Sequence, residues 1–210
     1  MAVLAIGAHP DDIEFGCFGT LAKLSQSEEV SLLVYTLGEL GGDPQTRRKE
    51  QIHNARLVGA SVKFLGHPDG RLVQDSTSVR ELREEITRSG ARTVYAPHPD
   101  DSHQDHAAAG HIAMTCRNLV SSVLFYETPS TVRFDPNVFE DVTDHFAVKR
   151  KALSSFQSQI NRPYLSVRSL EGLARYRAWQ CYRQGRLFEA FELFRRINDS
   201  GKAKRRAPSK

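Results

Sequence analysis

Residues 2–12 read AVLAIGAHPDD, an apolar run that leads directly into one histidine and two aspartates. Residues 93–106, TVYAPHPDDSHQDH, repeat this arrangement. The apolar parts, Ala2 to Gly7 and Thr93 to Ala96, have the character of strands buried in a parallel sheet. Because an open α/β sheet binds ligands at the carboxyl ends of its strands, the two polar clusters are expected to meet at that edge.

Strand and helix patterns alternate along most of the chain. Strands are predicted over residues 2–7, 30–37, 62–65, 93–96 and 123–126. Helices are predicted over residues 16–26, 43–58 and 78–88, and from about Gln104 onward. This alternation predicts an α/β fold with a mostly parallel sheet and helices on both faces. A strand over 138–142 and helices over 147–159 and 169–184 are expected to form a small C-terminal extension.

Length and charge narrow the class of protein. The 210 residues are 40% hydrophobic and 26% charged, as in ordinary globular proteins. We expect one domain over residues 1–200 and a disordered basic tail over 201–210. Five lysine and arginine side chains in this tail account for more than the net charge of +4, which leaves −1 for the rest. The basicity therefore gives no reason to expect a nucleic-acid partner.

The sequence also argues against secretion and membrane insertion. Its three cysteines are widely separated and form no C-x-x-C pair, which disfavours a disulfide scaffold and a cysteine zinc site. No apolar stretch is long enough to cross a bilayer, and the first apolar run lacks the basic start of a signal peptide. A cytoplasmic protein without a membrane partner is expected, and a homo-oligomer is compatible with the sequence.

The histidines and aspartates of the two clusters suggest a metal site. Imidazole and carboxylate groups are ligands of zinc, iron and related divalent ions, and catalytic sites use three of them and leave one position open. His9 and Asp12 lie three residues apart, and His103 and His106 repeat this spacing at the start of a predicted helix. The residue types alone leave the ligand set open, and the other candidates are His98, Asp100, Asp101 and Asp105.

At these residues the sequence resembles the LmbE-like, or PIG-L, family of zinc-dependent carbohydrate N-deacetylases. The AHPDD motif of the family stands at residues 8–12, and its HxDH motif stands at 103–106. The resemblance extends from Met1 to about Phe194 and includes the glycine-rich loop at 38–42. Phe156 stands where many relatives carry a histidine. The resemblance implies a Rossmann-like, three-layer α/β/α fold that binds no dinucleotide.

The resemblance also assigns roles to individual residues. It implies one Zn²⁺ per chain, with Fe²⁺ or another divalent ion as the alternative, held by His9, Asp12 and His106. Asp11 would be the general base, and His103 would stabilise the oxyanion of the intermediate. Such a site would remove the N-acetyl group from an N-acetylglucosamine-type sugar or glycoconjugate, releasing acetate and a free amine.

Three further residues have two interpretations each. By the resemblance, Arg47 and Asp69 would contact hydroxyl groups of the sugar substrate. Arg47 is equally compatible with a solvated pair with Glu50, and Asp69 with a simple turn before Gly70. Asp105 either orients one of the flanking histidines or caps the helix that follows.

Three rival functions share parts of this pattern. A two-metal phosphoesterase would use the plentiful carboxylates but needs two ions about 4 Å apart. A non-catalytic module that binds metal or sugar would hold zinc without hydrolysing N-acyl sugars. A non-haem iron oxygenase also uses two histidines and one carboxylate, but it normally has a fold built of strands alone.

Overall fold

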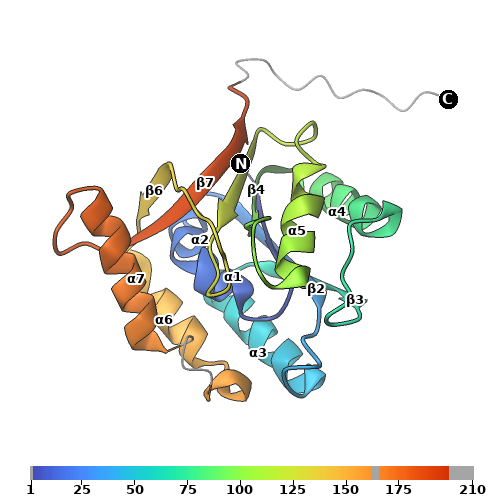
Figure 1. Ribbon diagram of the computed structural model, residues 1–210, viewed down its shortest axis with the longest axis horizontal. Coiled ribbons are helices and arrows are strands. Elements are labelled where there is room, and N and C mark those ends of the chain that lie inside the picture. Colours follow the sequence, from blue (N-terminus) through green and yellow to red (C-terminus); the bar gives the residue numbers. More distant parts are fainter. Residues whose placement is uncertain (1, 162–165, 199–210) are drawn as a thin grey trace.

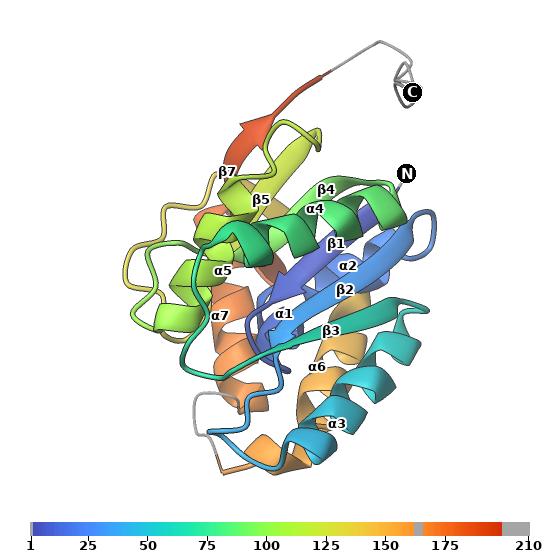
Figure 2. The same cartoon turned by 90° about the vertical axis from the view of Figure 1, so that its right-hand side faces the viewer.

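The computed structural model describes residues 2–161 and 166–198 (Figure 1). Its centre is a seven-stranded sheet with the strand order β3-β2-β1-β4-β5-β7-β6. The strands are β1 (Ala2–Gly7), β2 (Glu29–Thr36), β3 (Ser61–His67), β4 (Ala91–Pro97), β5 (Ser122–Tyr126), β6 (Val138–Asp141) and β7 (Phe188–Arg196). Strands β1 to β5 pair in parallel (Figure 2), and β7 pairs antiparallel with both β5 and β6. The predicted mostly parallel sheet is confirmed.

The direction in which strands are added reverses between β1 and β4. From β1 the chain moves outward to β2 and β3, and it then returns to place β4 on the other side of β1. Such a reversal opens a crevice at the carboxyl ends of the two strands, because the connections leave them in opposite directions. The two polar clusters of the sequence follow these two strands, so the topology brings them to the same crevice.

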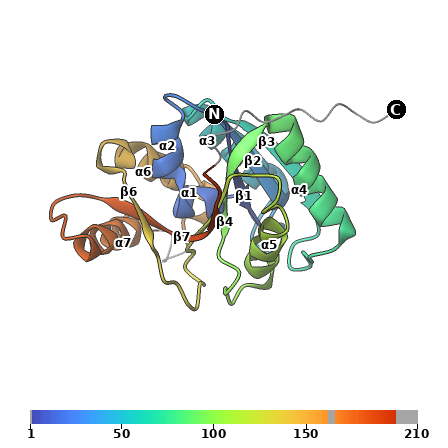
Figure 3. The ribbon, with the colours of Figure 1, turned by 90° about the horizontal axis from the view of Figure 1, so that it is seen from above.

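Helices cover both faces of the sheet, as predicted (Figure 3). Helices α4 (Ser76–Ser89) and α5 (Gln104–Met114) pack on one face. Helices α1 (Asp12–Gly16), α2 (Phe18–Leu24), α3 (Pro44–Leu57) and α6 (Phe146–Ser154) lie on the other face. Helix α7 (Val167–Gln180) packs against α6 through a third apolar cluster. The architecture is therefore the expected three-layer α/β/α arrangement.

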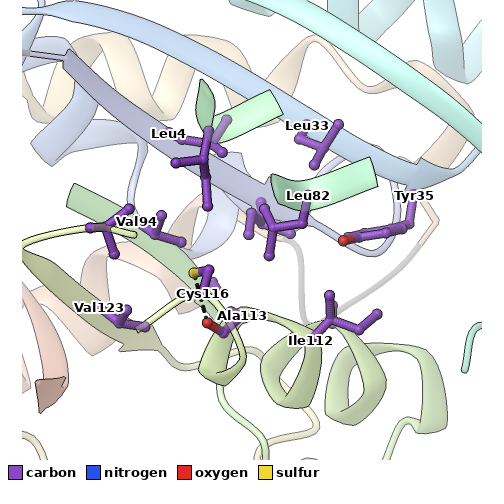
Figure 4. Close-up of a cluster of buried hydrophobic side chains, with 14 of the residues drawn as sticks. Leu4, Leu33, Tyr35, Leu82, Val94, Ile112, Ala113, Cys116 and Val123 are labelled. Carbon is purple, nitrogen blue, oxygen red and sulfur yellow. Dashed lines mark hydrogen bonds between the residues drawn. The ribbon is translucent and has the colours of Figure 1, made fainter. Parts of the chain in front are cut away.

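Apolar side chains from both layers fill the space between the sheet and its helices. In the layer shown in Figure 4, Leu4 and Leu33 of the strands pack with Leu82 of α4 and Ile112 of α5, and all four are completely buried. Burial of one such side chain contributes about 1.5–3 kcal/mol to stability. The sheet and its helices thus form a firm base for the loops at the strand ends.

The predicted helix over 16–26 is wrong in its start and its continuity. The chain forms two short helices, α1 and α2, which are separated at Cys17. Gly16 lies against the ring of Tyr126, and a Cβ atom at this position would stand 2.1 Å from Tyr126 Cδ2. This close packing explains the glycine, and the first helix begins at Asp12, inside the polar cluster.

Strand β7 was not predicted from the sequence. Its sequence, FEAFELFRR, places Glu189 and Glu192 three positions apart, so it lacks the regular alternation of apolar and polar residues that marks a strand with one exposed face. It lies between β5 and β6, antiparallel to both. The C-terminal extension therefore continues the central sheet.

The rest of the extension also differs in detail from the prediction. The helix expected over 147–159 ends at Ser154 in the structure, and a separate 3-10 turn, Gln157–Gln159, follows Phe156. Two aromatic residues at the end of α7 and just after it, Trp179 and Tyr182, are 64% and 91% exposed. The basic tail at 201–210 lies outside the described residues. Within the described ranges no helix has the length and apolarity to cross a membrane.

Candidate metal centre

A pocket of about 390 Å³ opens at the carboxyl ends of β1 and β4. The seven side chains to which the family resemblance assigned catalytic, metal-binding or substrate-binding roles all line this pocket: His9, Asp11, Asp12, Arg47, Asp69, His103 and His106. Loops from distant parts of the chain complete the wall with Leu40, Gly70, Thr128, Pro129, Ser130 and Gln159. The pocket coincides with the crevice that the strand order creates.

The turn after β1 folds its polar side chains inward. The backbone N–H of His9 donates to Asp12 Oδ2 at 2.8 Å, which closes the turn over Pro10. Asp11 has φ 102°, a left-handed backbone that non-glycine residues rarely adopt. This geometry directs Asp11 and Asp12 to different neighbours, although they are adjacent in the sequence and both are buried.

Three potential ligand side chains from the two clusters converge. His9 Nδ1 lies 3.2 Å from His106 Nε2, although the residues are 97 positions apart in the sequence. Asp12 Oδ1 lies 3.1 Å from His106 Nε2, and Asp12 Oδ2 lies 3.6 Å from His9 Nδ1. A second grouping combines His9, His106 and His103. The meeting of the two clusters, which the metal hypothesis requires, is therefore present.

The outer nitrogen of His9 faces carboxylates. His9 Nε2 lies 2.9 Å from Asp69 Oδ1 and 3.2 Å from Asp105 Oδ2. A carboxylate accepts hydrogen bonds, so Nε2 carries the proton in the neutral ring and Nδ1 keeps its lone pair toward the pocket. Burial opposes protonation of His9, but hydrogen bonds to Asp105, Asp12 and Asp69 outweigh it and raise the pKa of His9 well above its usual value.

His106 also has one ring nitrogen directed at hydrogen-bonding groups and the other directed at the pocket. Its outer nitrogen, Nδ1, lies 3.2 Å from Ser130 Oγ and 3.3 Å from Thr128 Oγ1, which leaves Nε2 toward the pocket. Burial lowers the pKa of His106, but the charge of Asp12 and the hydrogen bond to Asp101 dominate and raise it to about 9. The surroundings thus favour positive charge where the inner nitrogens and Asp12 meet.

This donor set fits a divalent cation. Two imidazole nitrogens and one carboxylate are the ligand types of catalytic zinc sites. With the outer nitrogens directed to hydrogen-bond acceptors, the inner lone pairs face each other, and a cation between them removes their repulsion. His9, Asp69 and Asp105 also form a compact group. Their carboxylates, however, already accept the backbone N–H groups of Leu40, Gly70 and Leu72, so this group is suited to orienting His9 rather than to holding an ion.

His103 has a different environment from the other two histidines. It is the residue that caps α5, and its Nδ1 accepts the backbone N–H of Asp105 at 3.2 Å. The neutral ring therefore carries its proton on Nε2. Burial and the charges of His106 and His9 lower the pKa of His103, which keeps the ring neutral. Its ring stacks on His106 at a centroid distance of 4.5 Å. The structure thus resolves the alternatives for Asp105, since His103 caps the helix and Asp105 contacts His9.

Helix α3 holds Asp11. Asp43 caps this helix and Pro44 begins it, which places Arg47 in the first turn facing the pocket. Arg47 Nη2 lies 3.1 Å from Asp11 Oδ2 and donates to the carbonyl of Pro10 at 2.6 Å. Burial raises the pKa of Asp11 to about 7 against the opposing charge of Arg47, while the charge of His106 keeps the pKa of Asp12 well below its usual value although burial opposes this.

The neighbours of Arg47 differ from those suggested by the sequence. The solvated pair with Glu50 does not form, because Arg47 is buried and Glu50 accepts hydrogen bonds from Ser158. Arg47 Nη1 donates to the carbonyl of Gly38 at 2.8 Å. Gly38 has φ 67°, and a Cβ atom there would stand 2.0 Å from Arg47 Nη1, which explains the glycine. Contact of Arg47 with a sugar stays a prediction.

Two of the other ligand candidates lie away from the pocket. His98 is buried between Phe125 and Phe134, and its Nε2 lies 3.1 Å from Glu192 Oε2. Asp100 is half exposed beside Arg133. The sequence interpretation missed Thr128, Ser130 and the pocket role of Gln159. The only sequence signal for Thr128 and Ser130 was their position after a predicted strand, and Gln159 lay at the end of a predicted helix.

The sheet is doubly wound, and histidine and carboxylate groups converge where its strand order reverses, between β1 and β4. These features define the class of the protein as an α/β protein with a candidate metal site. The model of the PIG-L family, described as GlcNAc-PI de-N-acetylase, matches residues 4–117. The chain belongs to this family.

Three relatives illustrate the range of the fold. The chain is 36% identical to YaiS of Escherichia coli (strain K12), described as an uncharacterized deacetylase, over 74% of this chain and 90% of YaiS. The N,N'-diacetylchitobiose deacetylase of Pyrococcus horikoshii is 26% identical, with a TM-score of 0.78 over 92% of this chain and 83% of that one. The hydratase GalB of Pseudomonas putida, which acts on 4-carboxy-2-hydroxymuconate, has a TM-score of 0.81 at 20% identity, over 96% and 99% of the two chains. This last likeness concerns the fold alone, so the reaction has to be argued from the site.

Proposed function

We propose that this chain is a zinc-dependent hydrolase that removes the N-acetyl group from an N-acetylglucosamine-type sugar or glycoconjugate. The observation that carries the proposal is the convergence of His9 Nδ1, His106 Nε2 and Asp12 at distances of 3.1–3.6 Å, with Asp11 buried in the same pocket. These three side chains would hold the ion. Fe²⁺ or another divalent cation is compatible with the same ligands.

The bound ion would supply Lewis-acid chemistry, because zinc lowers the pKa of a coordinated water to about 7 and polarises a carbonyl oxygen. Asp11 would take one proton from the attacking water as the new C–O bond forms. Its position supports this role, since Arg47 holds one carboxylate oxygen in place at 3.1 Å. The amide C–N bond then breaks, and Asp11 returns the proton to the leaving nitrogen, giving acetate and a free amine.

His103 would stabilise the negative charge that develops on the carbonyl oxygen. Because Nδ1 of His103 accepts a backbone N–H, the neutral ring has Nε2–H available to donate within the pocket. A donor held in advance of the reaction is worth about 3–4 kcal/mol in comparable oxyanion sites. This role needs no protonation of His103, in agreement with the lowered pKa of its ring.

Family membership supports an N-acetylated sugar as the substrate. The family model is described by its action on an N-acetylglucosamine conjugate, and the relative from P. horikoshii is a deacetylase of an N-acetylated disaccharide. The polar groups of Arg47, Asp69, Gln104 and Gln159 at the pocket wall suit a substrate rich in hydroxyl groups. We infer a small sugar or sugar conjugate as the substrate, and we propose contacts with Arg47 and Asp69.

The proposal is tested by loading metal-free protein with zinc and measuring acetate release from a panel of N-acetylglucosamine conjugates. We expect one zinc per chain, turnover of at least one conjugate, and loss of turnover in the presence of a chelator. Asp11→Ala should keep its zinc and lose turnover, whereas Asp12→Ala should lose the zinc. Two ions per chain with release of phosphate from esters would instead identify a phosphoesterase. Zinc binding without hydrolysis of any conjugate would identify a binding module.

A further inference from the structure

Asp101 lies behind His106, on the side of the ring that faces away from the pocket. Its side chain is completely inaccessible to solvent, and Asp101 Oδ1 stands 3.4 Å from His106 Nδ1. The same oxygen accepts the backbone N–H of His103 at 2.8 Å. One carboxylate group therefore contacts the ring of His106 and the backbone of His103 without reaching the pocket wall.

The other oxygen of Asp101 fixes the neighbouring loop. Asp101 Oδ2 accepts the hydroxyl groups of Thr128 at 2.6 Å and Thr131 at 3.0 Å. Because the Thr128 hydroxyl donates to Asp101, its oxygen is left as an acceptor for the N–H of His106, 3.3 Å away. His106, Thr128 and Asp101 thus form a directed chain of hydrogen bonds that ends on a carboxylate.

Backbone pairing holds this arrangement together. Asp101 and Thr131 form an antiparallel bridge. On either side of it, Ser102 N–H donates to the Ser130 carbonyl and Val132 N–H donates to the Asp100 carbonyl, both at 3.0 Å. Backbone hydrogen bonds therefore join the loop before α5, residues 100–103, to the segment 130–132, and residues 128–130 form one wall of the pocket.

We propose that Asp101 is a positioning residue, which fixes the ring orientation and tautomer of His106 and joins the loop before α5 to the pocket wall at Thr128. This inference rests on the proposed function, because it takes His106 as a metal ligand. Acceptors behind a ligating histidine raise its basicity, and removing one typically weakens metal binding about 10- to 100-fold.

The experiment measures zinc affinity of the metal-free protein by competition with a fluorescent chelator, so it does not depend on turnover. We expect Asp101→Asn to bind zinc about 10- to 100-fold more weakly than the unmodified chain. Asp100→Asn is the matched control, because this adjacent carboxylate is half exposed beside Arg133 and does not line the pocket. It should change the affinity by less than about twofold.

A second pair of variants separates positioning from general loss of structure. Thr128→Val removes the hydroxyl group between Asp101 and His106 and keeps the shape of the side chain, so the affinity for zinc should fall. Thr128→Ser keeps the hydroxyl group and should restore most of the affinity. If Asp101→Asn does not fold, this pair decides the question by itself.

The outcomes distinguish the two proposals. Unchanged zinc affinity in Asp101→Asn or in Thr128→Val overturns the positioning role and leaves the hydrolase proposal intact. Equal loss in Thr128→Val and Thr128→Ser also overturns it, since the hydroxyl group would then be irrelevant. Zinc binding by the unmodified chain without acetate release from any conjugate overturns the hydrolase proposal, while the ratio of affinities still tests Asp101.

Discussion

The sequence His-Pro-Asp-Asp occurs twice, at residues 9–12 and 98–101, and the two copies have different environments. In the first copy, His9, Asp11 and Asp12 all line the pocket. In the second copy, His98 contacts Glu192, and Asp101 lies behind His106. Both copies follow a parallel strand at the switch point of the sheet, so strand position alone does not explain the difference.

The position of the following helix does explain it. Helix α1 begins at Asp12, inside the first copy, which forces a tight turn with Asp11 in a left-handed conformation. Helix α5 begins only at Gln104, after the second copy has ended. Two residues, Ser102 and His103, separate the second copy from its helix. The second copy therefore lies outside the pocket, and His103 and His106 line the pocket in its place. The same four residues therefore serve two purposes, because the loop length before the helix differs.

The largest difference is expected in turnover. Asp11→Asn removes the carboxylate proposed as general base and should lower kcat by about 10²- to 10⁴-fold. Asp100→Asn makes the same change at the matching position of the second copy and should leave kcat within about twofold. Steady-state acetate release from zinc-loaded variants measures both. Similar losses in the two variants would contradict the functional distinction between the copies.

The second expected difference is in stability, which should depend on pH in opposite directions at the two copies. Burial raises the pKa of Glu14, beside the first copy, to about 8, and one of its oxygens has no hydrogen-bond partner among residues 2–161 and 166–198. A raised pKa stabilises the folded state below the unfolded value of about 4.3, and this stability is lost as pH rises toward 8. Glu14→Gln should gain stability relative to the unmodified chain over this range, by about 1.4 kcal/mol for each unit of pKa difference.

Beside the second copy the sign is reversed. The hydrogen bonds from His106, Thr128 and Ser130 hold the pKa of Asp101 well below its usual value although burial opposes this. This contribution is present at neutral pH and is lost as pH falls below the usual Asp value of about 3.9. Urea unfolding of metal-free Asp101→Asn should therefore show less acid sensitivity than the unmodified chain. The same urea unfolding tests Glu14. If the difference in the free energy of unfolding between Glu14→Gln and the unmodified chain does not change with pH, the pH dependence does not come from Glu14.

Substitution of the first histidine of each copy, His9 or His98, should distinguish an effect on metal binding from an effect on stability. His98→Gln disrupts a partly buried hydrogen bond to Glu192 and should lower the free energy of unfolding by about 1 kcal/mol while the zinc content stays at one per chain. His9→Gln should lose the zinc. Elemental analysis and chemical denaturation of both variants check this, and loss of zinc from folded His98→Gln would speak against it.

The last expected difference concerns the backbone. At residue 11 the left-handed conformation should make Asp11→Gly more stable than Asp11→Ala by about 1–2 kcal/mol, since both lack the carboxylate and only alanine carries a Cβ. At residue 100 the order should reverse by about 0.5–1 kcal/mol, because Asp100 is not among the described non-glycine residues with positive φ. Thermal unfolding of the four variants measures both differences, and the same order at both positions would contradict the explanation from helix position.

Most of the fold was predictable, because apolar runs followed by turn residues mark buried parallel strands directly. Strand β7 was not predictable in this way, since its sequence lacks regular alternation and its partners, β5 and β6, are distant in the sequence. The break between α1 and α2 was missed for a similar reason. It depends on the ring of Tyr126, more than a hundred residues away from Gly16.

For the site, the sequence by itself determined which chemical groups are present and that they follow two strands, because residue type and local spacing are properties of the chain alone. Only the tertiary structure decided which groups meet. The 3.2 Å separation of His9 and His106, the nitrogen that each ring turns inward, and the different environments of the two His-Pro-Asp-Asp copies all depend on contacts between segments far apart in the chain. Such contacts follow from strand order and loop length, and no local pattern of residues encodes them.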